Sequence, residues 1–369
     1  MNKKEKYKKI LVIIIGILIL FFVGQAVIKV AKITPFLFQL VFNHDINLKK
    51  SDGRINILLL GVGGGSHDGP NLTDTMIFAS VDINKNKVSL ISIPRDLWIQ
   101  DLNAKINTAY SSGEAKRRGG GLILSEAVVG KILNQPIDYG VRIDFNGFIK
   151  AVDEVGGLDI NVDRTFDDFI YPIDGKENES CGHTDEEIKT YTATVSAEAD
   201  LAQFFPCRYE HVHFDKGLIH MDGKTALMFV RSRHAQGVEG SDFARSQRQE
   251  KVIKAFKDKI LSVQTIINPT RIISLYDIVK GSVDTDIKVD EFDDFIRLFQ
   301  KLKNAKIENA VLDTGNEEAK RPGLLVNPVP SENYNFQWVL IPRIGDNNFS
   351  EIQKYVDCEI KSGNCPVSK

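Results

Sequence analysis

An unbroken apolar segment near the N-terminus constrains this chain most, because it decides on which side of a membrane the remainder folds. Residues 10–28, ILVIIIGILILFFVGQAVI, contain no charged side chain and follow the strongly basic MNKKEKYKK. At about 1.5 Å per residue, a helix of this length nearly matches a hydrocarbon core about 30 Å thick. We therefore predict a transmembrane anchor over residues 10–31.

A cleaved signal peptide is the alternative reading of this segment. Such peptides have a shorter apolar region of about 7–15 residues and a small-residue cleavage site, and GQAVIKV offers no convincing one. The preceding lysines predict that residues 1–9 are a short cytoplasmic tail. We expect residues 32–53 to be an extracytoplasmic connector, and everything beyond them to lie outside the cell membrane.

Four cysteines agree with this placement. Outside the cytosol an even number of cysteines predicts disulfides, most simply the two sequence-local pairs, Cys181 with Cys207 and Cys358 with Cys365. A zinc site is the alternative, but neither pair has the C-x-x-C spacing. We therefore expect two disulfides.

From Arg54 onwards, strand patterns alternate with helix patterns. Short apolar runs bounded by turn signals predict strands over 54–62, 75–82, 87–96, 138–145, 158–162 and 307–313. Amphipathic or capped segments predict helices over 119–134, 146–157, 221–233 with Asp222 as its cap, 241–261, 270–281 and 289–304. This alternation predicts one α/β domain, residues 54–313, with three αβα layers and a mixed central sheet.

Two segments interrupt or follow this pattern. Residues 163–210 lose periodicity and gain acidic side chains, which indicates an insertion tied by the first cysteine pair. Residues 314–369 contain the loop-like KRPGLLVNPVPSENY and then a short helix with the second pair. We interpret them as a C-terminal tail.

Charged residues gather in three clusters of the predicted domain. The formal net charge of −2 argues against a protein that coats nucleic acid, so any anion binding must come from local clusters. The loop GVGGGSHDGPNLTDT carries Asp68 and Asp74, and SIPRDLW carries Arg95 and Asp96, with Lys105 shortly after. The third cluster, VRSRHAQGVEGSDFARSQRQ, contains Arg231, Arg233, Asp242, Arg245, Arg248 and Gln249.

The third cluster suits an anion. Arg245 and Gln249 are four residues apart and Arg248 is three from Arg245, so these side chains can share a helix face. Guanidinium groups pair bidentately with phosphate oxygens. Carboxylates repel phosphate unless a cation stands between them, so Asp68 and Asp74 predict a Mg²⁺ or Mn²⁺ site beside a pyrophosphate.

Each cluster alone has an ordinary explanation. A glycine-rich loop is most often a turn, an Arg-Asp pair is most often a surface ion pair, and a run of arginines can be a solvated helix face. No Ser-His-Asp pattern or paired-cysteine nucleophile is visible in the sequence. The occurrence of all three charged clusters in one predicted domain is what favours an anion-binding site.

Several motifs occur together in a characteristic order beneath the N-terminal apolar segment. They are ILLLGVGG, LTDTMIFASVD, VSLISIPRD, KINTAY, DFNGFIKAVDEVGGLDINV, LIHMDGKTALMFVRSR and SDFARSQRQ. In this combination the chain resembles the LytR-CpsA-Psr family, closely over residues 54–262 and more weakly to about residue 313. The resemblance implies an α/β domain that buries a polyprenyl chain in a hydrophobic pocket.

The resemblance also implies a Mg²⁺-dependent phosphotransferase of cell-wall assembly. Such an enzyme moves a glycopolymer from polyprenyl pyrophosphate onto a peptidoglycan hydroxyl and leaves a phosphodiester link. By motif matching, Asp74 takes the metal-associated position and Arg95 the strand-end position that contacts pyrophosphate. The remaining pyrophosphate ligands would be Lys105, Arg231, Arg233, Arg245, Arg248 and Gln249. Asp96 is the candidate base for the acceptor hydroxyl.

Two departures from the family pattern concern the metal. The family reads G-x-D after the first strand, where this chain has Gly61-Val62-Gly63, so Asp68 is the substitute ligand. The arginine of the family's R-S-D-T element is Leu72 here. These departures leave open a non-catalytic polyprenyl-pyrophosphate receptor or regulator, and a pyrophosphate hydrolase is a third possibility. A transcriptional role is disfavoured, because the domain would lie across the membrane from the chromosome.

Overall fold

A computed structural model describes residues 45–65, 69–192, 198–260, 262, 265, 269–316 and 321–367. The predicted anchor and cytoplasmic tail, most of the connector, and Asp68 lie outside these residues. Within the described part of the chain, no helix combines the length and apolarity needed to cross a bilayer.

The chain divides into two compact units. The smaller one joins residues 288–300 to the segment that ends at Leu48, and its main element is helix α11 (Phe292–Lys301). There Arg297 donates to Asp293 Oδ2 at 2.6 Å and to Asp294 Oδ1 at 2.8 Å. The larger unit, residues 49–287 and 301–369, contains the candidate site and is described below.

A six-stranded mixed sheet forms the centre of the larger unit, in the order β11-β6-β1-β2-β3-β12. The strands are β1 (Ile55–Val62), β2 (Thr73–Asp82), β3 (Lys87–Ile93), β6 (Tyr139–Asp144), β11 (Val283–Thr285) and β12 (Lys306–Val311). β2 runs antiparallel to both β1 and β3, whereas β6 is parallel to β1 and β12 is parallel to β3. The predicted mixed sheet is confirmed.

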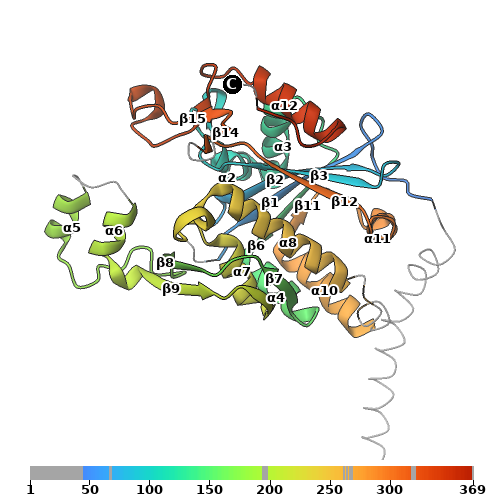
Figure 1. The fold of residues 1–369 in the computed structure, drawn as a ribbon, viewed down its shortest axis with the longest axis horizontal. Coiled ribbons are helices and arrows are strands. Elements are labelled where there is room, and N and C mark those ends of the chain that lie inside the picture. The colour runs from blue at the N-terminus through green and yellow to red at the C-terminus, as the bar shows by residue number, and fades with distance from the viewer. Residues whose placement is uncertain are drawn as a thin grey trace, which may run out of the picture. The chain divides into compact units, whose positions relative to one another are not determined.

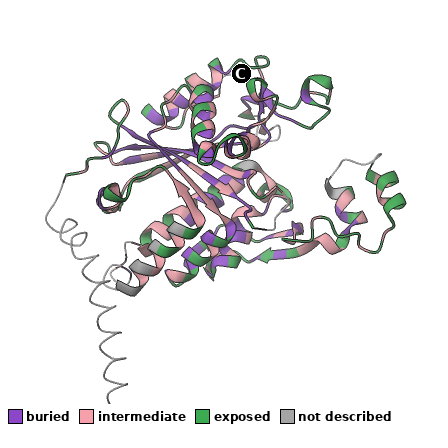
Figure 2. Cartoon of the chain, turned by 180° about the vertical axis from the view of Figure 1, so that it is seen from behind, coloured by how far each residue is buried: buried purple, intermediate pink, exposed green. Residues whose placement is uncertain are grey.

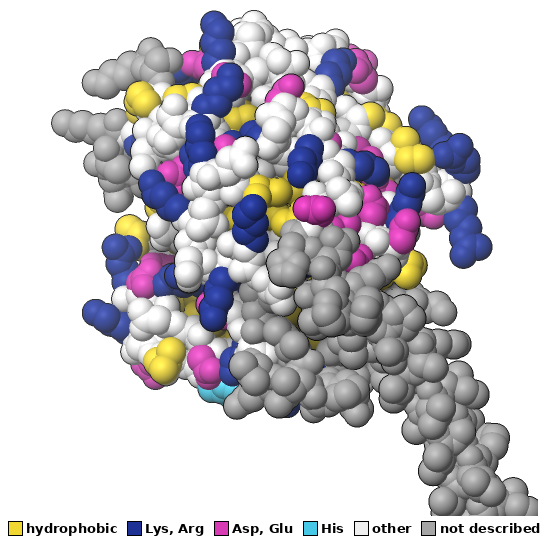
Figure 3. All heavy atoms as spheres, turned by 90° about the vertical axis from the view of Figure 1, so that its right-hand side faces the viewer, with side chains coloured by type: hydrophobic (Ala, Val, Ile, Leu, Met, Phe, Trp, Pro, Cys, Tyr) yellow, Lys and Arg dark blue, Asp and Glu magenta, His cyan; other side chains and the backbone are white. Residues whose placement is uncertain are grey.

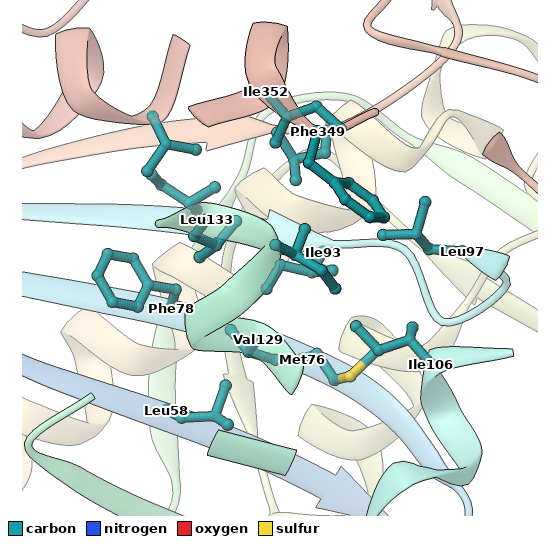
Figure 4. Packing of buried hydrophobic residues seen from close by; sticks show 14 of the residues in the cluster. Leu58, Met76, Phe78, Ile93, Leu97, Ile106, Val129, Leu133, Phe349 and Ile352 are labelled. Atoms are coloured by element: carbon teal, nitrogen blue, oxygen red, sulfur yellow. The ribbon is translucent and has the colours of Figure 1, made fainter. Parts of the chain in front are cut away.

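One face of this sheet is covered by helices α2 (Ala109–Lys116), α3 (Gly120–Leu133) and α12 (Ser350–Lys361) (Figure 1). Alternation along the strands directs Leu58 and Phe78 to this face. Val129 of α3, and Phe349 and Ile352 at the start of α12, belong to the same buried cluster (Figure 4). This cluster is the main core of the larger unit.

The other side of the sheet carries helices α4 (Phe145–Glu154), α7 (Gly223–Arg231), α8 (Asp242–Ile260) and α10 (Pro269–Ser282) (Figure 1). A second apolar cluster joins α4, α7 and α8 through Val152, Phe229 and Val252. Asp222 caps α7 as predicted, because its side chain accepts from Thr225 N at 2.8 Å. Figure 2 shows the strands of the central sheet largely buried between the two helical layers, whereas outer helix faces, loops and the arm carry most of the exposed residues. The predicted three layers are present.

The predicted C-terminal tail belongs to the same unit as the sheet. Leu324, Leu325, Val356 and Ile360 join the core on the α3 side of the sheet. The short strands β15 (Leu325–Val326) and β16 (Ile341–Pro342) pair with each other ahead of α12. Sequence patterns missed this because each apolar stretch between the prolines is too short to show a period.

The inserted segment is an arm built on a two-stranded ribbon. Strand β8 (Phe166–Pro172) pairs antiparallel with β9 (Tyr209–Phe214), and helices α5 (Asp185–Thr192) and α6 (Glu198–Phe204) lie beyond it (Figure 1). The bond between Cys181 and Cys207 closes the arm, and the bond between Cys358 and Cys365 closes the end of α12. These are the two sequence-local pairs.

The ribbon and one neighbouring strand were not anticipated from the sequence. Strand β10 (Gly217–Met221) pairs with β7 (Leu158–Val162), so the predicted helix over 221–233 starts after a strand. The alternation in β9 was masked by the charged and histidine side chains that fill its outer positions. An inserted segment can therefore be regular although its composition is polar.

Glu126 of α3 predicts a pH dependence of stability. Its carboxyl group lies against Gly140 of β6, and burial, aided by the neighbouring Asp286, raises the pKa of Glu126 to about 7. Ionising this carboxyl group is less favourable in the folded protein than in the unfolded chain. The free energy of unfolding is therefore highest below the unfolded-state pKa, near 4.5, and falls as the pH rises towards 7. Glu126→Gln should therefore gain about 1–2 kcal/mol relative to the wild type between pH 4 and pH 8, allowing for partial exposure. Denaturant unfolding of both proteins across this range measures the difference, and a difference independent of pH would contradict it.

Candidate active site

The strand order brings the predicted loops to one edge of the sheet. β2 begins where β1 ends, and β3 ends beside the start of β2, because both pairs are antiparallel. The glycine-rich loop between β1 and β2 is therefore next to the residues that follow β3. Asp74, at the start of β2, meets Arg95, which comes shortly after β3.

A row of alternating charges runs along this edge. Arg95 Nη1 donates to Asp74 Oδ1 at 2.6 Å, and Arg95 Nε lies 3.6 Å from Asp96 Oδ2. Lys105, on strand β5 (Ala104–Lys105), donates to Asp96 Oδ1 at 2.8 Å. Arg233 Nη2 lies 3.9 Å from Asp96 Oδ2. Three cations thus surround two carboxylates, which leaves an excess of positive charge for an anionic ligand.

The backbone of Asp96 is held by the C-terminal part of the chain. Leu340 N donates to Asp96 O at 2.9 Å, and Trp98 N donates to Leu340 O at 2.8 Å. Both carboxylate oxygens of Asp96 already face cations. This geometry favours a role in which Asp96 positions Lys105 and Arg233 over the predicted role as a base.

Helix α8 supplies the opposite wall of the site. Arg245, Ser246 and Gln249 line one pocket together with Asp74 and Thr75. Gln249 Nε2 lies 3.5 Å from Thr75 Oγ1, so the two walls are in contact through two residues that line the pocket. Ser246 fixes the helix against the sheet, since its Oγ lies 2.6 Å from the Oγ of Ser92 and donates to Asn309 Oδ1 at 2.9 Å. The structure therefore brings Arg245 and Gln249 into one pocket with Asp74.

A fully buried carboxylate fixes the turn that carries Arg233. Asp168 of β8 has 0% exposure, and its Oδ2 accepts from Ser232 Oγ at 2.6 Å. The same oxygen accepts from the backbone N–H groups of Arg233 at 3.2 Å and His234 at 3.3 Å. Sequence reasoning missed Asp168, because it lies within the segment interpreted as irregular. Its effect is to place the Arg233 side chain towards Asp96.

Arg231 has different surroundings from Arg233. Its Nη1 donates to Asp174 Oδ1 at 2.9 Å and to the hydroxyl of Tyr171 at 3.3 Å, and its guanidinium carbon lies 4.1 Å from the ring centroid of Phe145. Burial raises the pKa of Tyr171 to about 12, so this hydroxyl is neutral. Helix α7 ends at Arg231, and the chain turns at Ser232, so the two arginines of VRSR point into different environments.

The surroundings of Arg248 differ from those predicted for a pyrophosphate ligand. It is 3% exposed, and its guanidinium donates to the carbonyl oxygens of Phe229, Ser232 and Glu239 at 2.9, 2.6 and 2.9 Å. It also donates to Glu239 Oε2 at 3.1 Å. Burial lowers the pKa of Arg248 to about 10, which still leaves it charged. All these donors are directed into the protein, so we assign Arg248 to positioning the end of α7 rather than to ligand binding.

The glycine-rich loop is shaped by a close approach to β6. Gly64 has φ of 69°, and a Cβ there would lie 2.7 Å from the Cβ of Asp144. Gly64 N donates to Pro70 O at 2.9 Å, so the loop folds back on itself. Asp68 lies outside the described residues, and its place as a metal ligand stays a prediction. Among the described loop residues, Asp74 and Thr75 line the pocket.

A further arginine at this edge was not singled out from the sequence. Arg142 of β6 lies 3.5 Å from Asp144 Oδ2 through Nη1 and donates to Asn71 Oδ1 at 3.4 Å through Nη2. A single arginine between Val141 and Ile143 near the end of a strand was the available signal. Parallel strands such as β1 and β6 end at the same edge of the sheet, where ligands commonly bind.

The pocket offers oxygen atoms of the kind that a hard divalent cation prefers. Asp74 contributes a carboxylate and Thr75 a hydroxyl group. Mg²⁺ is commonly held by one or two carboxylates together with substrate phosphates and waters, and Mn²⁺ takes similar ligands. This donor set fits such an ion when a pyrophosphate is bound.

The positive charge of the site is local. On the face shown in Figure 3, lysine and arginine side chains are spread among aspartate and glutamate side chains. The pattern agrees with the formal net charge of −2. The row of paired charges at the sheet edge is therefore the candidate for anion recognition.

The chain is similar to characterised proteins over most of its length. The LytR_cpsA_psr family model matches residues 25–326. A polyisoprenyl-teichoic acid–peptidoglycan teichoic acid transferase, TagU from Oceanobacillus iheyensis, is 30% identical over 70% of this chain and 66% of its own length. TagV from Bacillus subtilis, with the same transferase description, is 25% identical over 74% of this chain and 60% of its own length.

The chain thus spans less than two thirds of these two relatives. A crystal structure of Bacillus subtilis TagV has the same fold, with a TM-score of 0.52, 23% identity and coverage of 84% of this chain and 98% of that one. The family match covers the six strands of the central sheet, the helices that flank it except α12, and every charged residue of the row at the sheet edge. The chain belongs to the LytR-CpsA-Psr family.

Proposed function

We propose that this protein is a phosphotransferase that moves a glycopolymer from a polyprenyl-pyrophosphate carrier onto a hydroxyl group of peptidoglycan. The observation that carries the proposal is the row formed by Asp74, Arg95, Asp96, Lys105 and Arg233, with Arg245 across the pocket. Its guanidinium groups suit a diphosphate, and its carboxylates hold them in place when no anion is bound. Family membership and the transferase names of the relatives support the same reaction.

In the proposed reaction, an acceptor hydroxyl oxygen attacks the phosphorus atom that carries the glycopolymer. The bond from that phosphorus to the carrier phosphate breaks, polyprenyl phosphate leaves, and the hydroxyl proton passes to solvent or to a nearby base. Arg95 and Arg245 would stabilise the charge that develops on the phosphoryl oxygens. Asp96 would keep Lys105 and Arg233 aligned with the leaving phosphate.

A divalent cation completes this proposal. Asp74, with Asp68 as the second predicted ligand, would hold Mg²⁺ or Mn²⁺ against the pyrophosphate. Such an ion supplies charge neutralisation and polarises the phosphoryl group. The departure at Gly63, where the family has an acidic residue, makes Asp74 the more important ligand.

The names of the relatives suggest the class of donor. They are described as transferring teichoic acid from a polyisoprenyl carrier to peptidoglycan, so a teichoic acid is the first donor to test. In this proposal, the lipid carrier and the polymer acceptor meet at the outer face of a bilayer. An anchor over residues 10–31, with residues 1–9 in the cytoplasm, would keep the site close to both.

Reconstituted transfer tests the proposal. The full chain in detergent is given a polyprenyl-pyrophosphate-linked teichoic acid fragment, Mg²⁺ and peptidoglycan fragments. We expect polyprenyl phosphate to be released together with a phosphodiester adduct, and chelation of the metal to stop both. Mass spectrometry detects the two products.

Other outcomes separate the alternatives. Carrier binding without any product would contradict the transferase and favour a receptor or regulator. Release of free sugar phosphate or inorganic phosphate without an adduct would favour a hydrolase. Full transfer after chelation would contradict the metal ligands proposed here.

A further inference from the structure

Two histidines and an aspartate share the exposed face of the arm's ribbon. Along β9, Val212 and Phe214 point into the core, so His211 and His213 point outwards. Asp167 of β8 is the direct cross-strand partner of His213. These side chains do not take part in the charge row described above, and the proposed transfer reaction does not use them.

The three side chains converge on one point. His211 Nε2 and His213 Nδ1 lie 2.8 and 2.7 Å from the same oxygen, Asp167 Oδ1. These three atoms all lie within 4.8 Å of one another. With metal–ligand bonds of about 2.0–2.2 Å, tetrahedral zinc places its ligand atoms about 3.4 Å apart. Small movements of exposed side chains are enough to reach that geometry.

Neighbouring groups orient both imidazoles. The other ring nitrogen of His213, Nε2, lies 3.3 Å from Asp215 Oδ1. A carboxylate on the far nitrogen of a ligating histidine is a recurrent feature of metal sites, because it fixes the ring and its tautomer. His211 is held by Phe169, whose ring stacks on it at 4.3 Å with an interplanar angle of 6°.

We propose that Asp167, His211 and His213 form a binding site for a transition-metal ion of the Zn²⁺ type. Two imidazole nitrogens and one carboxylate oxygen suit Zn²⁺ far better than Mg²⁺ or Ca²⁺, which prefer oxygen ligands alone. Three protein ligands leave the fourth position to water or to a group from another molecule. The site is separate from the proposed magnesium site, which lies at Asp74 in the central sheet.

The bound ion would join β8 to β9 at the base of the arm. Asp168, the residue after the ligand Asp167, points to the opposite face of β8 and holds the turn of Arg233. Asp167 O also accepts from Gln236 N at 3.0 Å, just beyond that turn. Metal binding would therefore stiffen the strand on which the position of Arg233 depends.

Zinc titration of the full chain tests this site. The protein in detergent, stripped with a chelator, is titrated with Zn²⁺ by calorimetry and with Co²⁺ by visible absorption. We expect one ion per chain, with the absorption bands of a tetrahedral Co²⁺ complex. His211→Ala and His213→Ala should each lose this binding, and Asp215→Asn should weaken it about 10–100-fold.

His220→Ala is the matched control. His220 is also exposed and lies 2.7 Å from an aspartate oxygen, Asp159 Oδ1, but it belongs to a different ribbon. The His220→Ala variant should bind Zn²⁺ with the same affinity as the wild type. Failure of the wild type to bind, or unchanged binding by both His211→Ala and His213→Ala, would overturn the proposal. Far-ultraviolet circular dichroism of each metal-free variant shows that the fold is intact.

Discussion

Replacing Arg95 by alanine should lower kcat/KM for glycopolymer transfer by about 10²–10³-fold, the range found when one preorganised donor to a developing negative charge is removed. Arg95 bonds to Asp74 and lies beside Asp96, so its loss also leaves two carboxylates facing the phosphates with fewer cations between them. The transfer assay described above measures the change. The Arg95–Asp74 pair is partly exposed, so the free energy of unfolding should change by no more than about 1 kcal/mol.

Two further variants make this result specific. Arg95→Lys keeps the charge but loses the planar fork, so it should recover only part of the activity. Arg118→Ala, at an exposed position between α2 and α3, should transfer at the wild-type rate. Normal transfer by Arg95→Ala would remove the central residue from the proposed site.

Arg248→Ala should cost about 3–5 kcal/mol of folding free energy, which is the loss expected when one member of a buried ion pair is removed. The guanidinium satisfies three carbonyl oxygens and pairs with Glu239, whose side chain is also largely buried. Alanine would leave these acceptors without a donor and would open a cavity beside Phe229. Denaturant unfolding followed by circular dichroism measures the difference from the wild type.

A pair of variants separates this structural role from ligand binding. Glu239→Gln combined with Arg248→Met removes both charges and restores side-chain volume, so it should recover part of the lost stability. A variant of Arg248 that folds as well as the wild type but no longer binds the carrier would contradict the positioning role and restore the predicted one.

The sequence predicted the helices and strands that are long enough to show a regular spacing of apolar residues. The hairpin of β2 and β3 and the helices α3, α4 and α8 satisfied this condition. The strand order then explains why Asp74 and Arg95 meet, since a hairpin places the start of one strand beside the end of the other. The hydrophobic pattern and the topology of one hairpin were therefore sufficient to predict that Asp74 and Arg95 lie together.

The sequence did not predict the direction in which side chains point at helix ends and within the insertion. Arg245 and Arg248 are three residues apart on α8, yet Arg245 lines the pocket and Arg248 turns into the junction with α7. Helical spacing places residues on one side of a helix but does not say which neighbour that side meets. Asp168 escaped notice for a related reason, because its role depends on a turn more than 60 residues later in the chain.

The two backbone hydrogen bonds that Leu340 makes with Asp96 and Trp98 affect how the site forms during translation. A ribosome delivers Arg95 and Asp96 long before it delivers Leu340 and helix α12, which follows Leu340 in the chain. The nascent chain therefore carries Arg95 and Asp96 throughout the synthesis of the central sheet without the backbone hydrogen bonds that Leu340 makes to their loop. A chain truncated before Leu340 would contain every charged residue of the row at the sheet edge and still lack these hydrogen bonds.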